Sequence, residues 1–231
     1  MTKLPFILVV LSLASLLGSQ KKEIPGPLAE KGELLFSDDF ARKDIGEKWQ
    51  VSHDAFRIRD SVLIGKQVRD DHGAIGKVHV PMKDVVVSFR FKLAGSPRFN
   101  VVFDDKQHQE SHAGHLIRVA VAKKQIRLGD DREGVMRKDI REMRLDPTKK
   151  EAVEKLLEGK GTATKVDLES DRWYSMTIEI VGDKMRVSLD EKPIGFLQSP
   201  GLAHPTKESV HFTISGSDTH IDDVKIWKAK M

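Results

Sequence analysis

The stretch that decides the fold class runs from residue 85 to residue 103 and reads VVVSFRFKLAGSPRFNVVF. Apolar and polar residues alternate along both of its halves, with the period of two that is typical of half-buried β-strands. One face of each strand then carries apolar side chains toward a core, and these are Val85, Val87, Phe89 and Phe91, followed by Phe99, Val101 and Phe103. The stretch therefore predicts two strands, each buried on one face only.

The same alternation recurs along the chain and predicts about fourteen short strands. They cover residues 34–36, 56–59, 62–65, 73–80, 84–93, 98–104, 115–122, 125–128, 163–168, 173–181, 184–189, 194–197, 210–214 and 221–227. Turn residues such as Gly182-Asp183 join neighbouring strands in hairpins. So many short strands predict an all-β fold, a two-sheet antiparallel jelly-roll sandwich.

Residues 131–160 break the strand pattern. Their composition is dominated by charged side chains and contains no aromatic residue, so they cannot form a core strand. Asp146 as an N-cap, Pro147 at the first helical position and Gly159 at the end predict a short amphipathic helix between them. This charged helical insert either covers a sheet edge at the surface or forms a lid over a ligand groove.

The composition is that of a globular chain, with 39% apolar and 32% charged residues among 231. Lysine and arginine number 39 against 35 aspartates and glutamates, a net charge of +4. This balance is well short of a nucleic-acid-binding composition. Nucleic acid is therefore not an expected partner.

The first residues have the pattern of a secretory signal peptide. Lys3 precedes an apolar run of residues 4–17 and the small residues Gly18-Ser19. The run is too short for a membrane-spanning helix, and without cysteine the chain has no lipobox for a lipid anchor. We expect a signal peptide over residues 1–19, a linker over 20–33 and one domain over 34–228, in a secreted or periplasmic protein without a membrane anchor after cleavage.

The outward faces of the central strands suggest a binding surface. If the apolar residues of 85–103 face the core, the opposite face carries Arg90, Asn100 and Asp104, to which the strand at 115–122 can add Arg118. Asn100 is the only asparagine of the chain, and asparagine is depleted from strands. These side chains would suit sugar hydroxyls, and the alternative is a solvated face with cross-strand ion pairs.

A second group of polar residues follows in the next loop and strand. It contains Asp104, Asp105, His108, His112 and His115. Imidazoles and carboxylates are common metal ligands, and histidine titrates near working pH, so the group could bind a metal or act as an acid/base pair. The alternative is that these histidines are ordinary surface residues.

The ends of the domain offer a third group. Asp38-Asp39 near the first strand and Asp222-Asp223 in the last strand would approach if the terminal strands are neighbours. Carboxylate oxygens suit a divalent metal such as calcium, so Asp39 and Asp222 are candidate ligands of a structural calcium site. Otherwise they are turn and cap residues.

Three stretches of the chain together resemble one family. They are LFSDDF at 35–40 with Trp49, the strands at 85–91 and 98–103, and the closing segments 172–180, 185–190 and 221–227. The chain looks like the 3-keto-disaccharide hydrolase domain family, which belongs to the concanavalin A-like jelly rolls, over residues 34–228. The resemblance implies a carbohydrate partner in a concave groove and cleavage of 3-keto glycosides.

This chemistry requires a base beside the ketone, an acid for the departing oxygen, and cations or a metal that hold the enolate. His115, Asp104 and Arg90 or Arg118 could fill these roles, with Asn100 and His112 as further substrate-binding residues. Two-carboxylate retaining hydrolysis is not expected, because the Glu-x-Asp-x-x-Glu signature is broken at Tyr174.

Two alternatives to an enzyme stay open. One is a lectin-like domain that binds glycans and turns nothing over, although aromatic platforms are scarce, because Trp49, Trp173 and Trp227 are expected to pack in the core. The other is a structural or envelope interaction domain that uses the charged insert as its contact surface.

Overall fold

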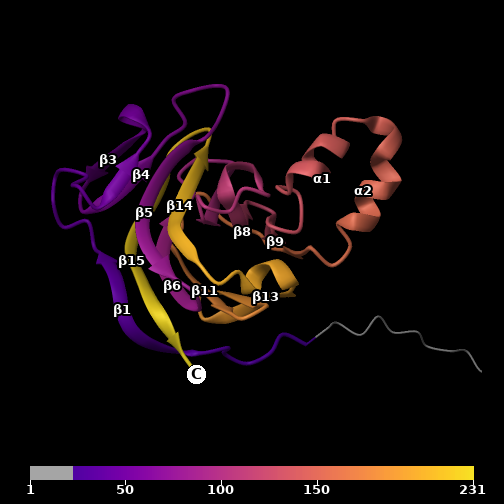
Figure 1. Cartoon of the computed structure of the whole chain (residues 1–231). Coiled ribbons are helices and arrows are strands. Elements are labelled where there is room, and N and C mark those ends of the chain that lie inside the picture. The colour runs from indigo at the N-terminus through magenta and orange to yellow at the C-terminus, as the bar shows by residue number, and fades with distance from the viewer. Residues whose placement is uncertain (1–22) are drawn as a thin grey trace, which may run out of the picture.

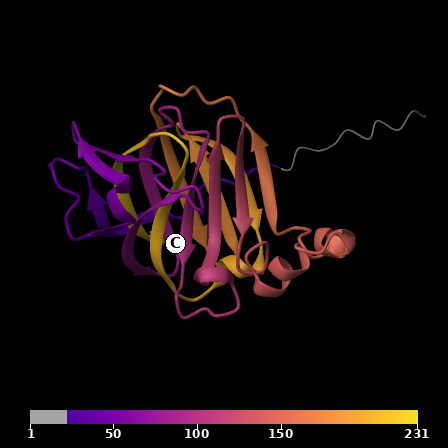
Figure 2. The same ribbon diagram turned by 90° about the horizontal axis from the view of Figure 1, so that it is seen from above.

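The computed structural model describes residues 23–231 as two antiparallel β-sheets packed face to face (Figures 1 and 2). The predicted signal peptide lies outside the described residues. Sheet A has the strand order β13 (Lys192–Gln198), β12 (Lys184–Leu189), β11 (Tyr174–Val181), β6 (Val85–Lys92), β15 (Thr219–Lys230), β4 (Val62–Gly65) and β3 (Phe56–Arg59), and β1 (Glu30–Asp38) also pairs with β15. Sheet B has the order β10 (Gly161–Lys165), β9 (Gln125–Asp130), β8 (His115–Ala122), β7 (Arg98–Asp104), β14 (Lys207–Ser215), β5 (Ala74–Met82) and β2 (Trp49–Val51).

The core lies between the two sheets and contains the predicted side chains. Val85, Val87 and Phe91 of β6 and Phe99, Val101 and Phe103 of β7 are fully buried. The rings of Phe91 and Phe99 meet across the sandwich with centroids 5.0 Å apart. The jelly-roll prediction is confirmed, and the turn at residues 93–97 carries the chain from sheet A to sheet B.

Some boundaries differ from the sequence prediction. The three-residue strand β2 was not predicted, and β10 begins at Gly161 rather than at 163. Residues 166–168 run on beyond β10, where Val166 and Leu168 donate backbone hydrogen bonds to Lys124 and Lys123 of the β8–β9 turn. The strand β1 begins at Glu30, inside the segment expected to be a linker.

The tryptophans do not all pack in the core. Trp49 is buried against Phe36, Phe40 and Phe212, as expected. Trp173 and Trp227 are half-buried on the outer face of sheet A, where Arg90 covers the ring of Trp173 and Lys31 that of Trp227. The core prediction was therefore wrong for these two, because Trp173 lies just before β11, and Trp227 follows the buried Ile226 on β15, so that the pleat turns it outward.

The charged insert contains two short helices, α1 (Lys138–Met143) and α2 (Lys150–Leu156), beside the β8–β9 end of sheet B (Figure 1). Asp146 caps the 3₁₀ turn Pro147–Lys149 before α2, as predicted, by accepting a hydrogen bond from the Thr148 amide. Val153 is buried, whereas Leu156 is exposed. Within residues 23–231, no helix has both the length and the apolar character that crossing a membrane requires.

Candidate functional site

A buried carboxylate with three basic partners lies on the outer face of sheet B. Asp104 ends β7, His115 begins β8, His211 lies on β14 and Lys77 on β5. The pairing of the strands brings these residues together. His211 lies opposite Lys77 on β5 and opposite Val102 on β7, and Val102 is two residues before Asp104 on the same face of β7. A bulge in the β7–β8 ladder pairs Asp104 with His115.

Both oxygens of Asp104 accept hydrogen bonds from these neighbours. Oδ1 lies 2.6 Å from Nδ1 of His115, and Oδ2 lies 2.8 Å from Nδ1 of His211. The ammonium of Lys77 is 2.9 Å from the same Oδ2. Asp104 is only 1% exposed, so this carboxylate is compensated almost entirely by protein groups.

The electrostatics keep this carboxylate ionised. Burial raises the pKa of Asp104, but the hydrogen bonds from His115 and His211 outweigh it and hold the pKa well below its usual value. Burial also lowers the pKa of His211, and the hydrogen bond to Asp104 opposes this only in part. An ionised carboxylate with a neutral imidazole on His211 is the resulting state at neutral pH.

This protonation state fixes the tautomers of the rings. An ionised carboxylate only accepts hydrogen bonds, so the Nδ1 atoms of His115 and His211 must both carry hydrogen. In a neutral ring this leaves Nε2 unprotonated, with a lone pair directed away from the carboxylate. Each imidazole can therefore accept a proton or bind a metal.

The surface next to this cluster is also polar. On β8, Arg118 pairs with Asp131, with Nε 2.8 Å and Nη2 2.6 Å from the same carboxylate oxygen. Burial raises the pKa of Asp131, and Arg118 opposes the shift. Val102 occupies an outward position between His211 and Arg118 in the ladders and is nevertheless fully buried. Neighbouring side chains therefore cover β7 at Val102.

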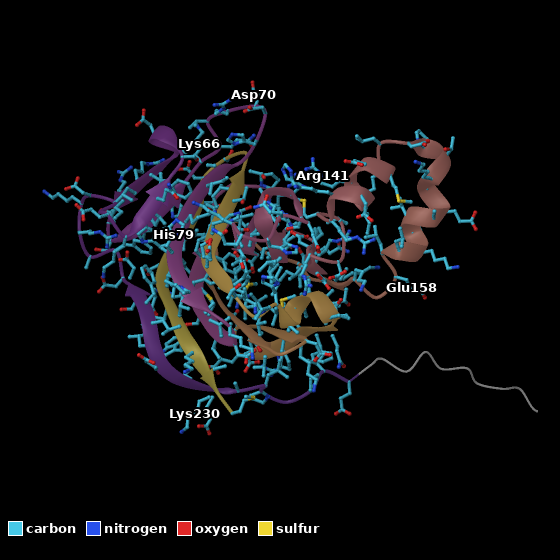
Figure 3. The ribbon with its side chains drawn as sticks, viewed as in Figure 1. Lys66, Asp70, His79, Arg141, Glu158 and Lys230 are labelled. Carbon is cyan, nitrogen blue, oxygen red and sulfur yellow. The ribbon has the colours of Figure 1, made fainter. Side chains whose placement is uncertain are left out.

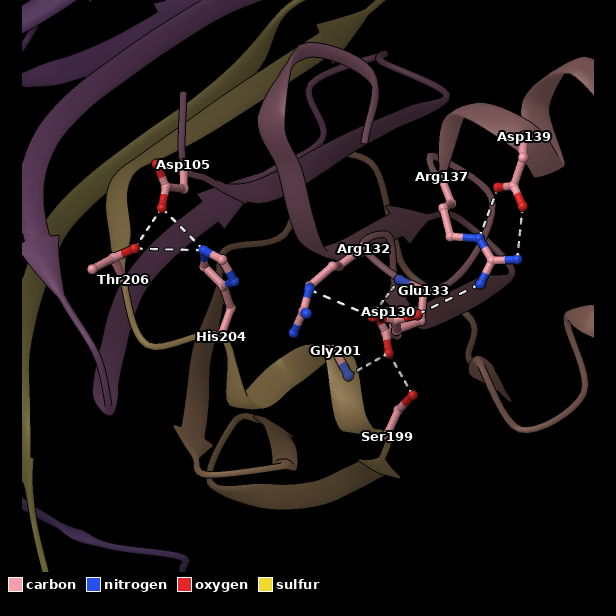
Figure 4. A network of polar contacts seen from close by, with 10 residues as sticks. All are labelled: Asp105, Asp130, Arg132, Glu133, Arg137, Asp139, Ser199, Gly201, His204 and Thr206. Carbon is pink, nitrogen blue, oxygen red and sulfur yellow. Dashed lines mark hydrogen bonds and ion pairs between the residues drawn. The ribbon is translucent and has the colours of Figure 1, made fainter. Parts of the chain in front are cut away.

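The loops beyond the cluster are held by two further buried carboxylates (Figure 4). Asp105 accepts hydrogen bonds from Thr206 and from Nε2 of His204, which is 3.0 Å away. Asp130 accepts from the hydroxyl of Ser199 and from the amide of Gly201 at 2.9 Å. These contacts fasten the loop at 199–206 to the ends of β7 and β9.

A cavity of about 300 Å³ lies between this face and the charged insert. Arg118, Arg127 and Ala163 line it from sheet B, and Val135, Leu157 and Lys160 line it from the insert. The insert thus both flanks the edge strand β10 and borders a cavity, which leaves both predicted roles for it in place.

The structure brings some of the predicted site residues together. Asp104 and His115 are in contact, and Arg118 and Asn100 lie on the same outer face, where Asn100 is half-buried opposite Thr213 and Ala120. His112 is exposed in the turn before β8, with its ring centroid 6.1 Å from that of His115.

Arg90 was wrongly grouped with these residues. It lies on β6 in sheet A, whereas Asn100, Asp104 and Arg118 are on sheet B. Its guanidinium pairs with Asp222 at 3.2 Å and covers the ring of Trp173. The prediction failed because alternation shows which side chains of a strand point toward the core, but it does not show to which of the two sheets the strand belongs.

The predicted calcium ligands lie at the β1–β15 pairing. The terminal strands are neighbours, with Asp38 opposite Val224, and Asp39 and Asp223 line one cavity. However, cations already compensate the carboxylates, because Asp222 pairs with Arg90 and Asp223 with Lys225. Calcium binding through Asp39 and Asp222 stays a prediction.

Two members of the cluster, His211 and Lys77, were not predicted from the sequence. The alternation Val210-His211-Phe212 already indicated an outward histidine, and Lys77 precedes the inward Val78 on β5. The register that brings residues 77, 104, 115 and 211 together could not be inferred from the sequence. Within residues 23–231, the group of three side chains able to hold a metal is Asp104, His115 and His211.

Comparison with known proteins identifies the fold. No family model and no curated protein matches the chain. Among solved structures, a Bacillus subtilis protein of unknown function with a galectin-like fold is 13% identical, with a TM-score of 0.61 over 88% of this chain and 100% of that chain. The chain has a galectin-like jelly-roll fold.

Two further similar structures have names that refer to carbohydrate. A carbohydrate-binding module from Bacillus subtilis is 9% identical, with a TM-score of 0.53 over 78% of this chain and 96% of its own. The catalytic domain of an endo-1,3-β-glucanase from Thermotoga petrophila RKU-1 is 12% identical, with a TM-score of 0.55 over 88% of this chain and 100% of its own. At such identities the likeness establishes the fold alone.

Proposed function

We propose that the chain is an exported carbohydrate-active domain that cleaves 3-keto glycosides on the outer face of sheet B, at the cluster around Asp104. The observation that carries the proposal is the 2.6 Å contact between Oδ1 of the buried Asp104 and Nδ1 of His115. The carbohydrate-binding and glucanase names of similar folds support a sugar as the ligand. The resemblance to 3-keto-disaccharide hydrolases supplies the substrate class.

In this proposal, His115 is the base. A ketone at C3 acidifies the hydrogen on C2, and Nε2 of His115 takes that proton while the C2–H electrons form an enolate. Expulsion of the C1 oxygen then breaks the glycosidic bond, and the imidazolium of His115 returns its proton to the departing oxygen. Addition of water to the resulting enone completes a net hydrolysis, so no oxidant or reductant is consumed.

Asp104 has a different role from the acid suggested by the sequence. It is buried, accepts hydrogen bonds from three side chains, and has a pKa well below its usual value. Such a carboxylate does not donate a proton at neutral pH. Asp104 is therefore a positioning residue that fixes the tautomer of His115, while Lys77 and Arg118 are the nearby cations that favour enolate formation.

The test is a time course of sugar release with matched pairs of ordinary and 3-keto glucosides. We expect release from the keto substrates alone, and a loss of roughly a hundredfold or more in His115→Gln. His79→Ala is the matched control, because His79 is an exposed histidine on β5 that contacts Gln50 and not the cluster (Figure 3). Release that is unchanged in His115→Gln would remove this residue from the mechanism.

A different outcome would favour the binding alternative. If no substrate is cleaved but the protein retains a glycan on a column, the face acts as a lectin-like surface. The cavity of about 300 Å³ between β10 and the insert would then be the first region to mutate. Deletion of the insert tests the interaction alternative, because partner capture would be lost, whereas sugar binding at the cluster around Asp104, away from the cavity that the insert lines, would be kept.

A further inference from the structure

We infer that Asp104, His115 and His211 form a binding site for a divalent transition metal of the zinc class. This inference stands apart from the proposed function, because it concerns the occupancy of the cluster and can be measured without a substrate.

The geometry of the three side chains carries the inference. One potential ligand atom from each residue lies within 4.8 Å of the other two. They come from three adjacent strands in the order β8, β7 and β14, so the sheet itself holds the ligands in place. Asp104 and His211 are almost completely buried, and His115 remains partly open, which provides a path of entry.

The donor set selects the class of metal. Two imidazole nitrogens with one carboxylate oxygen suit zinc and its neighbours in the first transition row, at about 2.0–2.2 Å from the ion. Calcium prefers six to eight oxygen ligands, which this set cannot supply. Three protein ligands leave a coordination position open for a small molecule.

Lys77 provides an internal check on the inference. Its ammonium is 2.9 Å from Oδ2 of Asp104, so it occupies part of the space and charge that a metal would take. The side chain of Lys77 is 16% exposed and can swing toward solvent when an ion arrives. Because Lys77 competes with the ion, removal of its charge should strengthen metal binding. If the cluster binds no metal, removal of the Lys77 charge would only take away one of the hydrogen bonds to Asp104.

Metal binding and the proposed proton transfer use the same ring of His115. The ring faces Asp104 through Nδ1, so a metal shared with Asp104 binds Nδ1 in place of its hydrogen. The neutral ring then carries its hydrogen on Nε2, which can no longer accept the substrate proton. We therefore expect excess zinc to inhibit cleavage of 3-keto glucosides and chelator to restore it. Metal binding by a protein that cleaves no substrate even after chelator treatment would refute the proposed function and leave this inference standing.

The experiment is calorimetric titration of the chelator-treated protein with zinc, together with visible absorption after addition of cobalt. We expect one ion per chain and a weakening of roughly tenfold or more in Asp104→Ala, His115→Ala and His211→Ala. His79→Ala should bind as the wild type does, and Lys77→Met should bind severalfold more tightly. Circular dichroism establishes which variants are folded. His115 is the least buried of the three ligands, so His115→Ala is the variant that should disturb folding least.

Two results would overturn the inference. One is a wild type that shows no heat of binding on titration with zinc and no visible absorption band after addition of cobalt. The other is equal affinity in the wild type, His115→Ala and Lys77→Met, which would place any bound metal elsewhere on the chain.

Discussion

Lys77 and His211 face each other across the β5–β14 ladder, and both contact the same oxygen of Asp104, at 2.9 Å and 2.8 Å. A cation and a neutral ring on adjacent strands therefore share one buried carboxylate. The carboxylate lies on the central strand β7, between β8 with His115 and β14 with His211.

The first prediction concerns the stability of this cluster. Asp104→Ala leaves Lys77 and two imidazoles without their common partner in a buried place. Breaking a buried charge pair from one side costs about 3–5 kcal/mol, and we expect a loss of this order in the free energy of unfolding. Urea denaturation of the variant measures it, with exposed His79→Ala as a control that should stay within about 0.5 kcal/mol of the wild type.

A second prediction concerns acid stability and Asp38. Its carboxylate is 2.7 Å from Nη2 of Arg42 and 2.7 Å from Nε1 of Trp49. Burial raises the pKa of Asp38, but hydrogen bonds from Arg42, the Phe40 amide and Trp49 leave the pKa below the ordinary 3.8. A depressed pKa means stability that is present above about pH 3.8 and is lost as the pH falls through the folded-state value.

Asp38→Asn should therefore be less stable than the wild type at pH 7, and the difference should shrink below pH 3.8. Thermal unfolding of both proteins across this range measures it. The neighbouring Asp39 is exposed, so Asp39→Asn should show almost no difference at either pH. A stability difference between the wild type and Asp38→Asn that does not change with pH would contradict a lowered pKa of Asp38.

A third prediction concerns alkaline stability and Lys207. This lysine is 1% exposed, and its ammonium donates to the carbonyl oxygens of Lys83 and His204. Burial lowers the pKa of Lys207 from 10.5 to about 8. Between these two values the unfolded chain holds a proton that the folded chain has released, so the contribution of Lys207 to stability increases with pH.

We expect the stability difference between the wild type and Lys207→Met to move in favour of the wild type by about 3 kcal/mol from pH 7 to pH 10.5. Chemical denaturation at several pH values gives this difference. Lys66→Met changes an exposed lysine (Figure 3) and should give a difference independent of pH. An absent shift would mean that Lys207 stays charged in the fold throughout this range, and a shift in the opposite direction would mean that the fold raises the pKa of Lys207.

A fourth prediction tests the loop that packs behind β9. A Cβ at Gly201 would overlap with the carboxylate of Asp130, which accepts hydrogen bonds from Ser199 and the Gly201 amide. Gly201→Ala should destabilise the protein by about 2 kcal/mol or more, because backbone and carboxylate cannot both keep their positions. Gly26→Ala has open space around the added atom and serves as the control in the same denaturation assay.

Much of the fold follows from the sequence, and the reason is local. Alternation in residues 85–91 and 98–103 determines which side chains face the core, since the pleat has a period of two whatever the partner strand is. The same argument finds Asp104 on an outward face and His115 at a strand start. It cannot identify Lys77 and His211 as their neighbours, because the register of distant strands depends on the packing of the whole core.

The error at Arg90 has the same origin. Residues 85–103 read as one continuous pattern, but the chain crosses from sheet A to sheet B within it. Alternation is unchanged by the crossing, so side chains that seem to share a face point out of opposite sides of the sandwich. Long-range contacts, and not propensities, separate Arg90 from Asp104.

The position of β15 constrains when the domain can fold. This strand, Thr219–Lys230, pairs with β6 along one edge and with both β4 and β1 along the other, so it lies inside sheet A. During synthesis, β1 and β4 are made more than 150 residues before the strand with which both of them pair. Until then β1, β4 and β6 expose unpaired edges, which are templates for pairing with other chains and hence for aggregation.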